Sequence, residues 1–145
     1  MKEKLEISQN KINELLKTDF TSSHGGSLEI NKINGEVILL FTSLYCTHCI
    51  DLLPELNEIN SLLENSSMVL FTDGKIQEIR EMVEFFNWTI PVVSYDEYNL
   101  NNYIPDIKLP FMLVLDGNKN VLSHGTIYNK TDSLLFLNSS SQRVK

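Results

Sequence analysis

The sequence has only two cysteines, Cys46 and Cys49, and they lie three positions apart in a chain of 145 residues. A disulfide framework that stabilises a small protein needs more cysteines, spread more widely. A bridge that closes so short a loop removes little entropy from the unfolded chain. These two cysteines are therefore not placed to hold a fold together.

Positive charge and long apolar runs are also scarce. The chain has 12 basic against 19 acidic side chains, and its formal net charge of -7 repels nucleic-acid phosphates and anionic lipid surfaces. The first 17 residues carry charges throughout and contain neither a signal-peptide core nor a membrane span. We therefore expect no nucleic-acid partner, no membrane span in this chain and, for the sequence as written, a cytoplasmic location.

What remains is the composition of a globular protein of single-domain size, with 42% hydrophobic and 21% charged residues. Ile12, Leu15 and Leu16 recur at helical spacing and predict an amphipathic N-terminal helix. We divide the chain into an N-terminal helix and linker over 1–26, a folded domain over 27–138 and a flexible polar tail over 139–145. We expect this chain to be a monomer.

Short apolar runs alternate with segments of helical periodicity along the domain. Runs without polar alternation predict buried strands, and spacings of three and four predict helices. The predicted strands are 28–30, 37–41, 68–71, 90–93, 111–115 and 121–123, and the predicted helices are 48–63, 76–86, 97–104 and 131–137. The alternation implies parallel strands and the turn after 111–115 an antiparallel hairpin, so we expect an α/β fold with a central mixed sheet flanked by helices.

The motif Cys46-Thr-His-Cys49 follows a predicted buried strand and opens a helix that Pro54 should kink. Backbone N–H groups at a helix start stabilise a thiolate at Cys46. Cys49 lies one helical turn further, within disulfide reach. This spacing predicts a two-step exchange in which Cys46 is the nucleophile and Cys49 resolves the mixed disulfide.

Residues beside the pair could influence this chemistry. His48 favours the thiolate if it is protonated or donates a hydrogen bond, and so it tunes the reduction potential. Tyr45 either shields the sulfur of Cys46 or only covers the helix end. We predict a cis peptide bond between Leu109 and Pro110, which would leave the Leu109 backbone free to pair with an extended substrate segment.

A zinc site is the alternative interpretation of the cysteine pair, with His24 or His124 as a further ligand. No second closely spaced ligand pair accompanies the cysteines, so we favour redox chemistry without a metal and without a cofactor beyond the pair itself. We then expect both histidines to be surface or hydrogen-bonded residues. We expect Trp88, with the two phenylalanines before it, to pack in the core.

Two separated stretches resemble the thioredoxin superfamily. The segment 41–54, FTSLYCTHCIDLLP, is similar to its signature, including the proline five residues after the second cysteine. The segment 109–117, LPFMLVLDG, is similar to its cis-proline strand and hairpin. The lead-in 27–35 and the added segment 90–103 resemble the TlpA/ResA-like branch of membrane-associated bacterial thioredoxins. Within that branch, 109–116 followed by 124–129 is similar to the MauD type, named for methylamine utilisation.

The resemblance implies a thioredoxin-like fold with an N-terminal extension and a β/α insertion before the cis-proline strand. It implies a thiol-disulfide oxidoreductase that forms or isomerises disulfides in a protein or peptide client, rather than a peroxide reductase. It also implies a second redox protein as partner and an extracytoplasmic or membrane-associated location. A general disulfide reductase and a non-catalytic module that binds a metal or a partner are the alternatives.

The sequence departs from this family at three positions near the cysteines. Many members have a tryptophan where this chain has Tyr45. Thioredoxins have a buried acid where this chain has Leu40, and ResA-like proteins often have a glutamate where it has Leu52. The proton acceptor for Cys49 is then His48, Asp51 or water.

Overall fold

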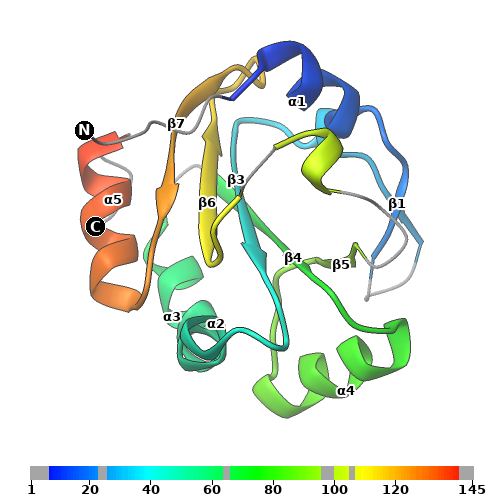
Figure 1. Cartoon of the computed structure of the whole chain (residues 1–145), viewed down its shortest axis with the longest axis vertical. Coiled ribbons are helices and arrows are strands. Elements are labelled where there is room, and N and C mark those ends of the chain that lie inside the picture. The colour runs from blue at the N-terminus through cyan, green and yellow to red at the C-terminus, as the bar shows by residue number, and fades with distance from the viewer. Residues whose placement is uncertain (1–6, 23–25, 64–65, 96–99, 105–106, 141–145) are drawn as a thin grey trace.

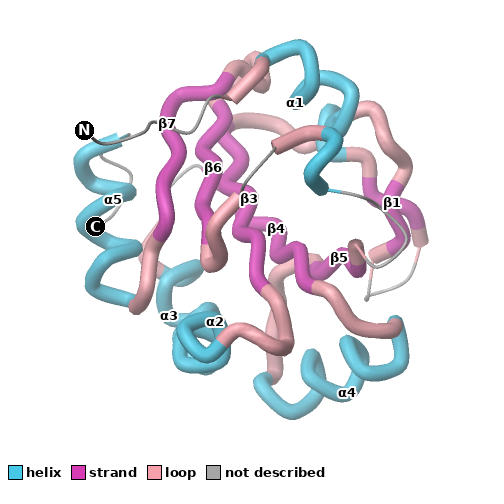
Figure 2. The backbone as a smooth tube through the Cα atoms, in the orientation of Figure 1, coloured by secondary structure: helices cyan, strands magenta, loops and turns pink. Residues whose placement is uncertain are grey.

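The computed structural model describes residues 7–22, 26–63, 66–95, 100–104 and 107–140. Five strands form one sheet through the middle of the molecule (Figure 1). They are β3 (Glu36–Thr42), β4 (Ser66–Thr72), β5 (Val92–Ser94), β6 (Phe111–Leu115) and β7 (Val121–Thr126). Their order is β5-β4-β3-β6-β7 (Figure 2). β3, β4 and β5 run parallel, and β6 and β7 are antiparallel, so the predicted mixed sheet is confirmed.

The central strand β3 is buried on both faces, because helices cover both sides of the sheet. Its side chains alternate between two hydrophobic clusters: Leu39 and Phe41 enter one, and Ile38 and Leu40 enter the other. Helix α1 (Gln9–Leu16) closes the first cluster. The second is closed by α2 (Thr47–Leu52), α3 (Leu56–Ser61), α4 (Ile76–Phe86) and α5 (Lys130–Ser140).

Helix α1 and Phe20 belong to the same core as the sheet. The apolar face of α1 is fully covered, and the ring of Phe20 meets that of Phe71 edge-on at 5.2 Å between centroids. Phe20 lies in β1 (Phe20–Thr21), which pairs with β2 (Ser27–Leu28), while Ser22 bridges to Val93 of β5. The strand predicted over 28–30 is therefore the shorter β2, and a 3-10 turn follows at Ile30–Lys32.

The helix predicted over 48–63 is divided in two at Pro54. α2 ends at Leu52, a 3-10 turn spans Leu53–Glu55, and α3 begins at Leu56. Proline has no N–H to donate within a helix, so the regular ladder is interrupted there. The indole of Trp88 donates to the Leu53 carbonyl oxygen at 3.2 Å, which satisfies an acceptor at the break.

The remaining predicted elements agree with the structure to different degrees. β6 and α4 have the predicted bounds. Helix α5 continues to Ser140, into the segment predicted as a tail. The helix predicted over 97–104 lies partly outside the described residues, and its described part holds a 3-10 turn at Leu100–Asn102. In the part of the chain that the structure describes, no helix combines the length and apolar character needed to cross a bilayer.

Candidate redox site at the end of the central strand

Cys46 lies between the end of β3 and the start of α2. It is the N-cap residue of α2, with extended backbone angles, and its Sγ accepts a hydrogen bond from the Cys49 N–H at 3.3 Å. An N-cap acceptor satisfies a backbone donor that has no partner within the helix, and a sulfur at this point lies at the positive end of the helix. The predicted placement of Cys46 is confirmed.

The two sulfurs differ in their exposure. Cys46 is partly exposed, whereas Cys49 has no exposed surface, and both thiols are free in this structure. Burial, a hydrogen bond with Cys46 and the charges of Cys46 and Asp73 together raise the pKa of Cys49 from 9.0 to about 12. Burial is the largest cause, and a backbone hydrogen bond with Ser43 opposes the shift. Cys49 is therefore a protonated thiol at neutral pH, and only Cys46 is open to a partner from solution.

The second predicted motif reaches the same place from far along the sequence. The peptide bond between Leu109 and Pro110 is cis, as predicted. The Leu109 carbonyl oxygen lies 3.7 Å from the Cys46 Sγ and accepts a hydrogen bond from it. The start of β6 thus lies against the exposed cysteine.

A side chain that the sequence analysis did not select anchors the loop before Cys46. The hydroxyl of Ser43 donates to Asp73 Oδ2 at 2.6 Å, and the Leu44 N–H donates to Asp73 Oδ1 at 2.8 Å. The Tyr45 N–H donates to the Ser43 hydroxyl and the Cys46 N–H to the Ser43 carbonyl oxygen. The sequence did contain a signal, because Asp73 directly follows β4, whose end lies beside the end of β3.

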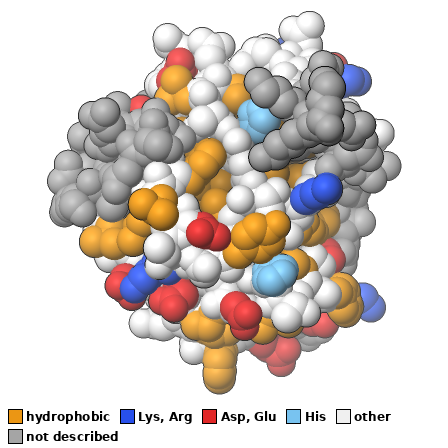
Figure 3. Space-filling view, turned by 60° about the vertical axis from the view of Figure 1, so that its left-hand side comes forward, with side chains coloured by type: hydrophobic (Ala, Val, Ile, Leu, Met, Phe, Trp, Pro, Cys, Tyr) orange, Lys and Arg blue, Asp and Glu red, His pale blue; other side chains and the backbone are white. Residues whose placement is uncertain are grey.

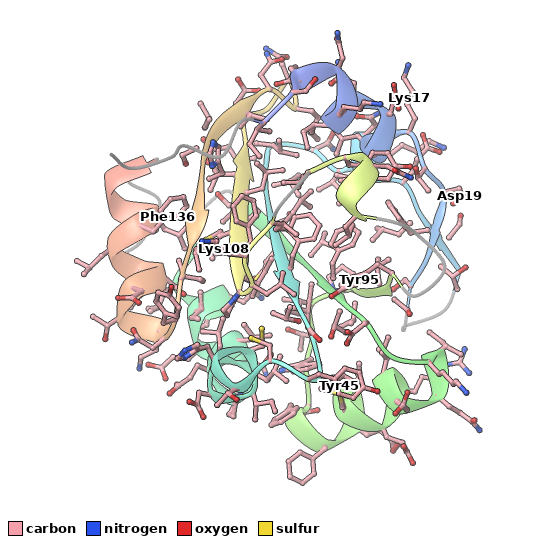
Figure 4. The ribbon with its side chains drawn as sticks, viewed as in Figure 1. Lys17, Asp19, Tyr45, Tyr95, Lys108 and Phe136 are labelled. Carbon is pink, nitrogen blue, oxygen red and sulfur yellow. The ribbon has the colours of Figure 1, made fainter. Side chains whose placement is uncertain are left out.

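Contacts from the neighbouring strands complete this anchor. The Tyr95 hydroxyl donates to the Thr42 carbonyl oxygen at 2.7 Å, at the last residue of β3 (Figure 4). Gly74 has φ +111, and a Cβ built there would lie 2.7 Å from Leu44 Cδ1. Only glycine adopts this backbone conformation readily and leaves room for Leu44.

The other predicted site residues lie around the pair with fewer contacts to it. His48 is exposed, and its ring meets Tyr128 edge-on at 4.9 Å, so its described partner is an aromatic ring rather than a sulfur. Tyr45 is 84% exposed, and its ring extends away from the core (Figure 4). Asp51 is exposed on α2. The face that Figure 3 shows has hydrophobic side chains interspersed with acidic ones and histidine.

The residues considered for a zinc site are separated from the cysteines or undescribed. His24 lies outside the described residues. His124 stacks on Phe111 at 5.8 Å, and burial lowers its pKa from 6.5. Within the described ranges, no group of three or more His, Cys, Asp or Glu side chains is placed to hold a metal ion.

The predicted aromatic cluster is partly confirmed. Trp88 is buried and stacks on Phe86 at 5.0 Å. Phe85 is 80% exposed and meets Phe86 edge-on, so the expectation that it packs in the core was wrong. Phe85 and Phe86 are adjacent on α4, and two successive residues of a helix do not face the same way.

Comparison with known proteins gives matches in structure alone, since no family model and no curated protein matches this sequence. A secreted disulfide oxidoreductase of Mycobacterium tuberculosis, homologous to E. coli DsbE, aligns with a TM-score of 0.66 at 14% identity over 79% of this chain and 87% of that one. A thioredoxin-like protein from Aeropyrum pernix aligns at 0.62 and 17% identity over 90% and 93%. The bacterioferritin comigratory protein of Xanthomonas campestris aligns at 0.76 and 12% identity over 97% and 98%.

At identities of 12 to 17% this likeness concerns the fold. The chain has a thioredoxin-like fold, as the resemblance of its two motifs implied. Its Cys-x-x-Cys pair lies at the end of the central strand, beside the cis-proline loop.

The raised pKa of Cys49 predicts a loss of stability in alkali. Between pH 9.0 and about 12 the unfolded chain has released the Cys49 proton while the folded chain retains it. The folded state then binds more protons, so the free energy of unfolding of the reduced protein falls as pH rises through this window. Denaturant unfolding of the wild type and of Cys49→Ala across that range should show the extra fall in the wild type only, and parallel curves would contradict the prediction.

The close contact at Gly74 predicts a sensitive position. Gly74→Ala strains a backbone with φ +111 and displaces Leu44, so we expect a loss of about 1–3 kcal/mol in the free energy of unfolding. Gly117→Ala is the matched control, because nothing lies within 4 Å of a Cβ built there. Equal stability of the two variants in denaturant unfolding would contradict this account.

Proposed function

We propose that this chain is a thiol-disulfide oxidoreductase that exchanges disulfides with a protein or peptide client through Cys46 and Cys49. The main support is the difference between the sulfurs: Cys46 is accessible and accepts the Cys49 N–H, while Cys49 is buried and protonated one turn away. A pair that served only as a structural bridge would need no such difference.

In the reduced form the reaction proceeds by two displacements. The Cys46 thiolate attacks one sulfur of a client disulfide, the client S–S bond breaks, and the leaving client sulfur takes up a proton. Cys49 then loses its proton and attacks Cys46, so that the Cys46–Cys49 bond forms and the second client thiol leaves. The client gains two electrons and the pair loses two; disulfide formation in a client is the same sequence reversed.

The Leu109 carbonyl oxygen supports a client of extended conformation. It lies at the cis bond before β6, 3.7 Å from the Cys46 Sγ, where a strand-like segment next to a client cysteine can pair with it. Tyr45 and Tyr128 are exposed near the start of α2 and would contact apolar side chains of the client. The partner class is therefore a protein or peptide, recognised by backbone pairing and apolar contact.

For the direction of transfer we propose disulfide formation or isomerisation, as in the MauD type, with a second redox protein that restores the pair. His48 lies exposed between the cysteines, where a positive charge favours the thiolate and thus the reduced form. Such chemistry belongs to an oxidising compartment, so we propose an extracytoplasmic location. The alternative, a general reductase, uses the same residues with the opposite electron flow.

A trapping experiment tests the client class. Cys49→Ser removes the resolving thiol, so the client should remain bound to Cys46 as a mixed disulfide that dithiothreitol releases. Cys46→Ser is the matched control and should trap nothing, since its remaining sulfur is buried. Mass spectrometry of adducts from the native host identifies the client, and equal adducts on both variants, or none on Cys49→Ser, would contradict a protein substrate.

The reduction potential tests the direction. We expect a value between about -200 and -120 mV, in the range of disulfide isomerases and oxidases, rather than the roughly -270 mV of thioredoxin. Equilibration with glutathione buffers gives the value, and His48→Ala should make it more negative. A wild-type potential near that of thioredoxin would favour the reductase alternative.

A further inference from the structure

We propose that Asp73 is the positioning residue for the resolving step, because its carboxylate fixes the loop against which both cysteines are placed. This inference rests on the proposed function. Asp73 is not part of the Cys-x-x-Cys motif or of the cis-proline loop, and it directly follows the neighbouring strand β4.

The Asp73 carboxylate accepts two hydrogen bonds from the loop before Cys46, one on each oxygen. One oxygen accepts the Ser43 hydroxyl at 2.6 Å and the other accepts the Leu44 N–H at 2.8 Å. The Ser43 hydroxyl in turn accepts the Tyr45 N–H at 3.1 Å. Every residue of the three-residue loop between β3 and Cys46 is thus held directly by Asp73 or through the Ser43 hydroxyl.

The held loop connects to both sulfur-bearing residues. The Ser43 carbonyl oxygen accepts the Cys46 N–H at 3.2 Å, and the Ser43 backbone also forms a hydrogen bond with Cys49. Resolution requires the Cys49 sulfur to reach Cys46 in line with the bond that breaks, and a small displacement of the reacting atoms slows such a step considerably. A loose loop would therefore slow the closure of the Cys46–Cys49 bond.

The surroundings of Asp73 differ from those of the three positions at which the sequence analysis considered an acid. Leu40 and Leu52 occupy the positions where related proteins have acids, and both are fully buried apolar residues. Asp51 is exposed on α2. Asp73 is partly buried at the end of β4 and is the carboxylate whose charge acts on Cys49.

Two substitutions separate positioning from charge. In Asp73→Asn the amide oxygen can still accept the Leu44 N–H, and the amide nitrogen can donate to the second lone pair of the Ser43 hydroxyl. Asp73→Ala loses both contacts. Glu81→Gln is the matched control, because Glu81 is exposed on α4 and its substitution removes one negative charge without touching the loop.

The measurement is release of a peptide from its mixed disulfide with Cys46 in a single turnover of the full chain with a synthetic peptide disulfide. We expect Asp73→Ala to slow release about tenfold, as for the loss of a hydrogen bond to a charged group. Asp73→Asn should remain within about threefold of the wild type or exceed it, and Glu81→Gln should not change the rate. The attack of Cys46 is measured separately in Cys49→Ser.

The proposal would be overturned if Asp73→Ala released the peptide at the wild-type rate. It would also be overturned if Asp73→Asn released the peptide as slowly as Asp73→Ala, because the carboxylate would then act as a proton acceptor. If Asp73→Ala does not fold, Ser43→Ala removes one of the two contacts and should also slow release, with Ser43→Thr restoring it. If the wild type forms no mixed disulfide, the proposed function fails. In that case, hydrogen exchange at the Leu44 amide still tests whether Asp73 holds the loop. We expect this exchange to be faster in Asp73→Ala than in Asp73→Asn, and equal rates would contradict the role of Asp73.

Discussion

Two sulfur atoms one helical turn apart differ in their contact with water, and the chemistry of the site follows from this difference. Cys46 is at the N-cap of α2, where the Cys49 N–H points at its sulfur. Cys49 is fully buried, and transfer from water to an apolar surrounding disfavours its ionised form. One short stretch of helix thus places one thiol within reach of solution and keeps the other buried and protonated, which is the arrangement that the proposed exchange needs.

The sheet order brings the necessary groups to one edge. β3 and β4 are parallel neighbours in register, so the loop before Cys46 and the residue after β4 emerge side by side. β6 is the antiparallel neighbour of β3, so its first residues lie at the end of β3, and Leu109 reaches the sulfur. Segments separated by roughly 30 and 60 residues in the sequence therefore meet without any long loop entering the core.

Much of this arrangement could be predicted from the sequence, because the local signals and the packing agree. The apolar run of β6 and the periodicity of α4 gave their bounds, and the two motifs that the sequence analysis singled out, around Cys46 and at Pro110, lie together in the candidate site. The division of the helix at Pro54 was underestimated as a kink, because the Trp88 indole that supports the break comes from a distant segment. Asp73 was not selected: its position directly after β4 was a signal, but that position does not show that its partners are the Ser43 hydroxyl and the Leu44 N–H.

The causes of the raised Cys49 pKa do not all persist through the reaction. Burial is the largest and stays, as does the charge of Asp73, but the hydrogen bond and the charge contributed by Cys46 belong to its free thiol or thiolate. Once Cys46 is bonded to a client sulfur, it has no charge and no proton to share, so both of these contributions vanish. In the proposed exchange, the first displacement therefore lowers the pKa of Cys49 and eases the loss of the proton on which the second depends, which links the two proposed steps in their required order.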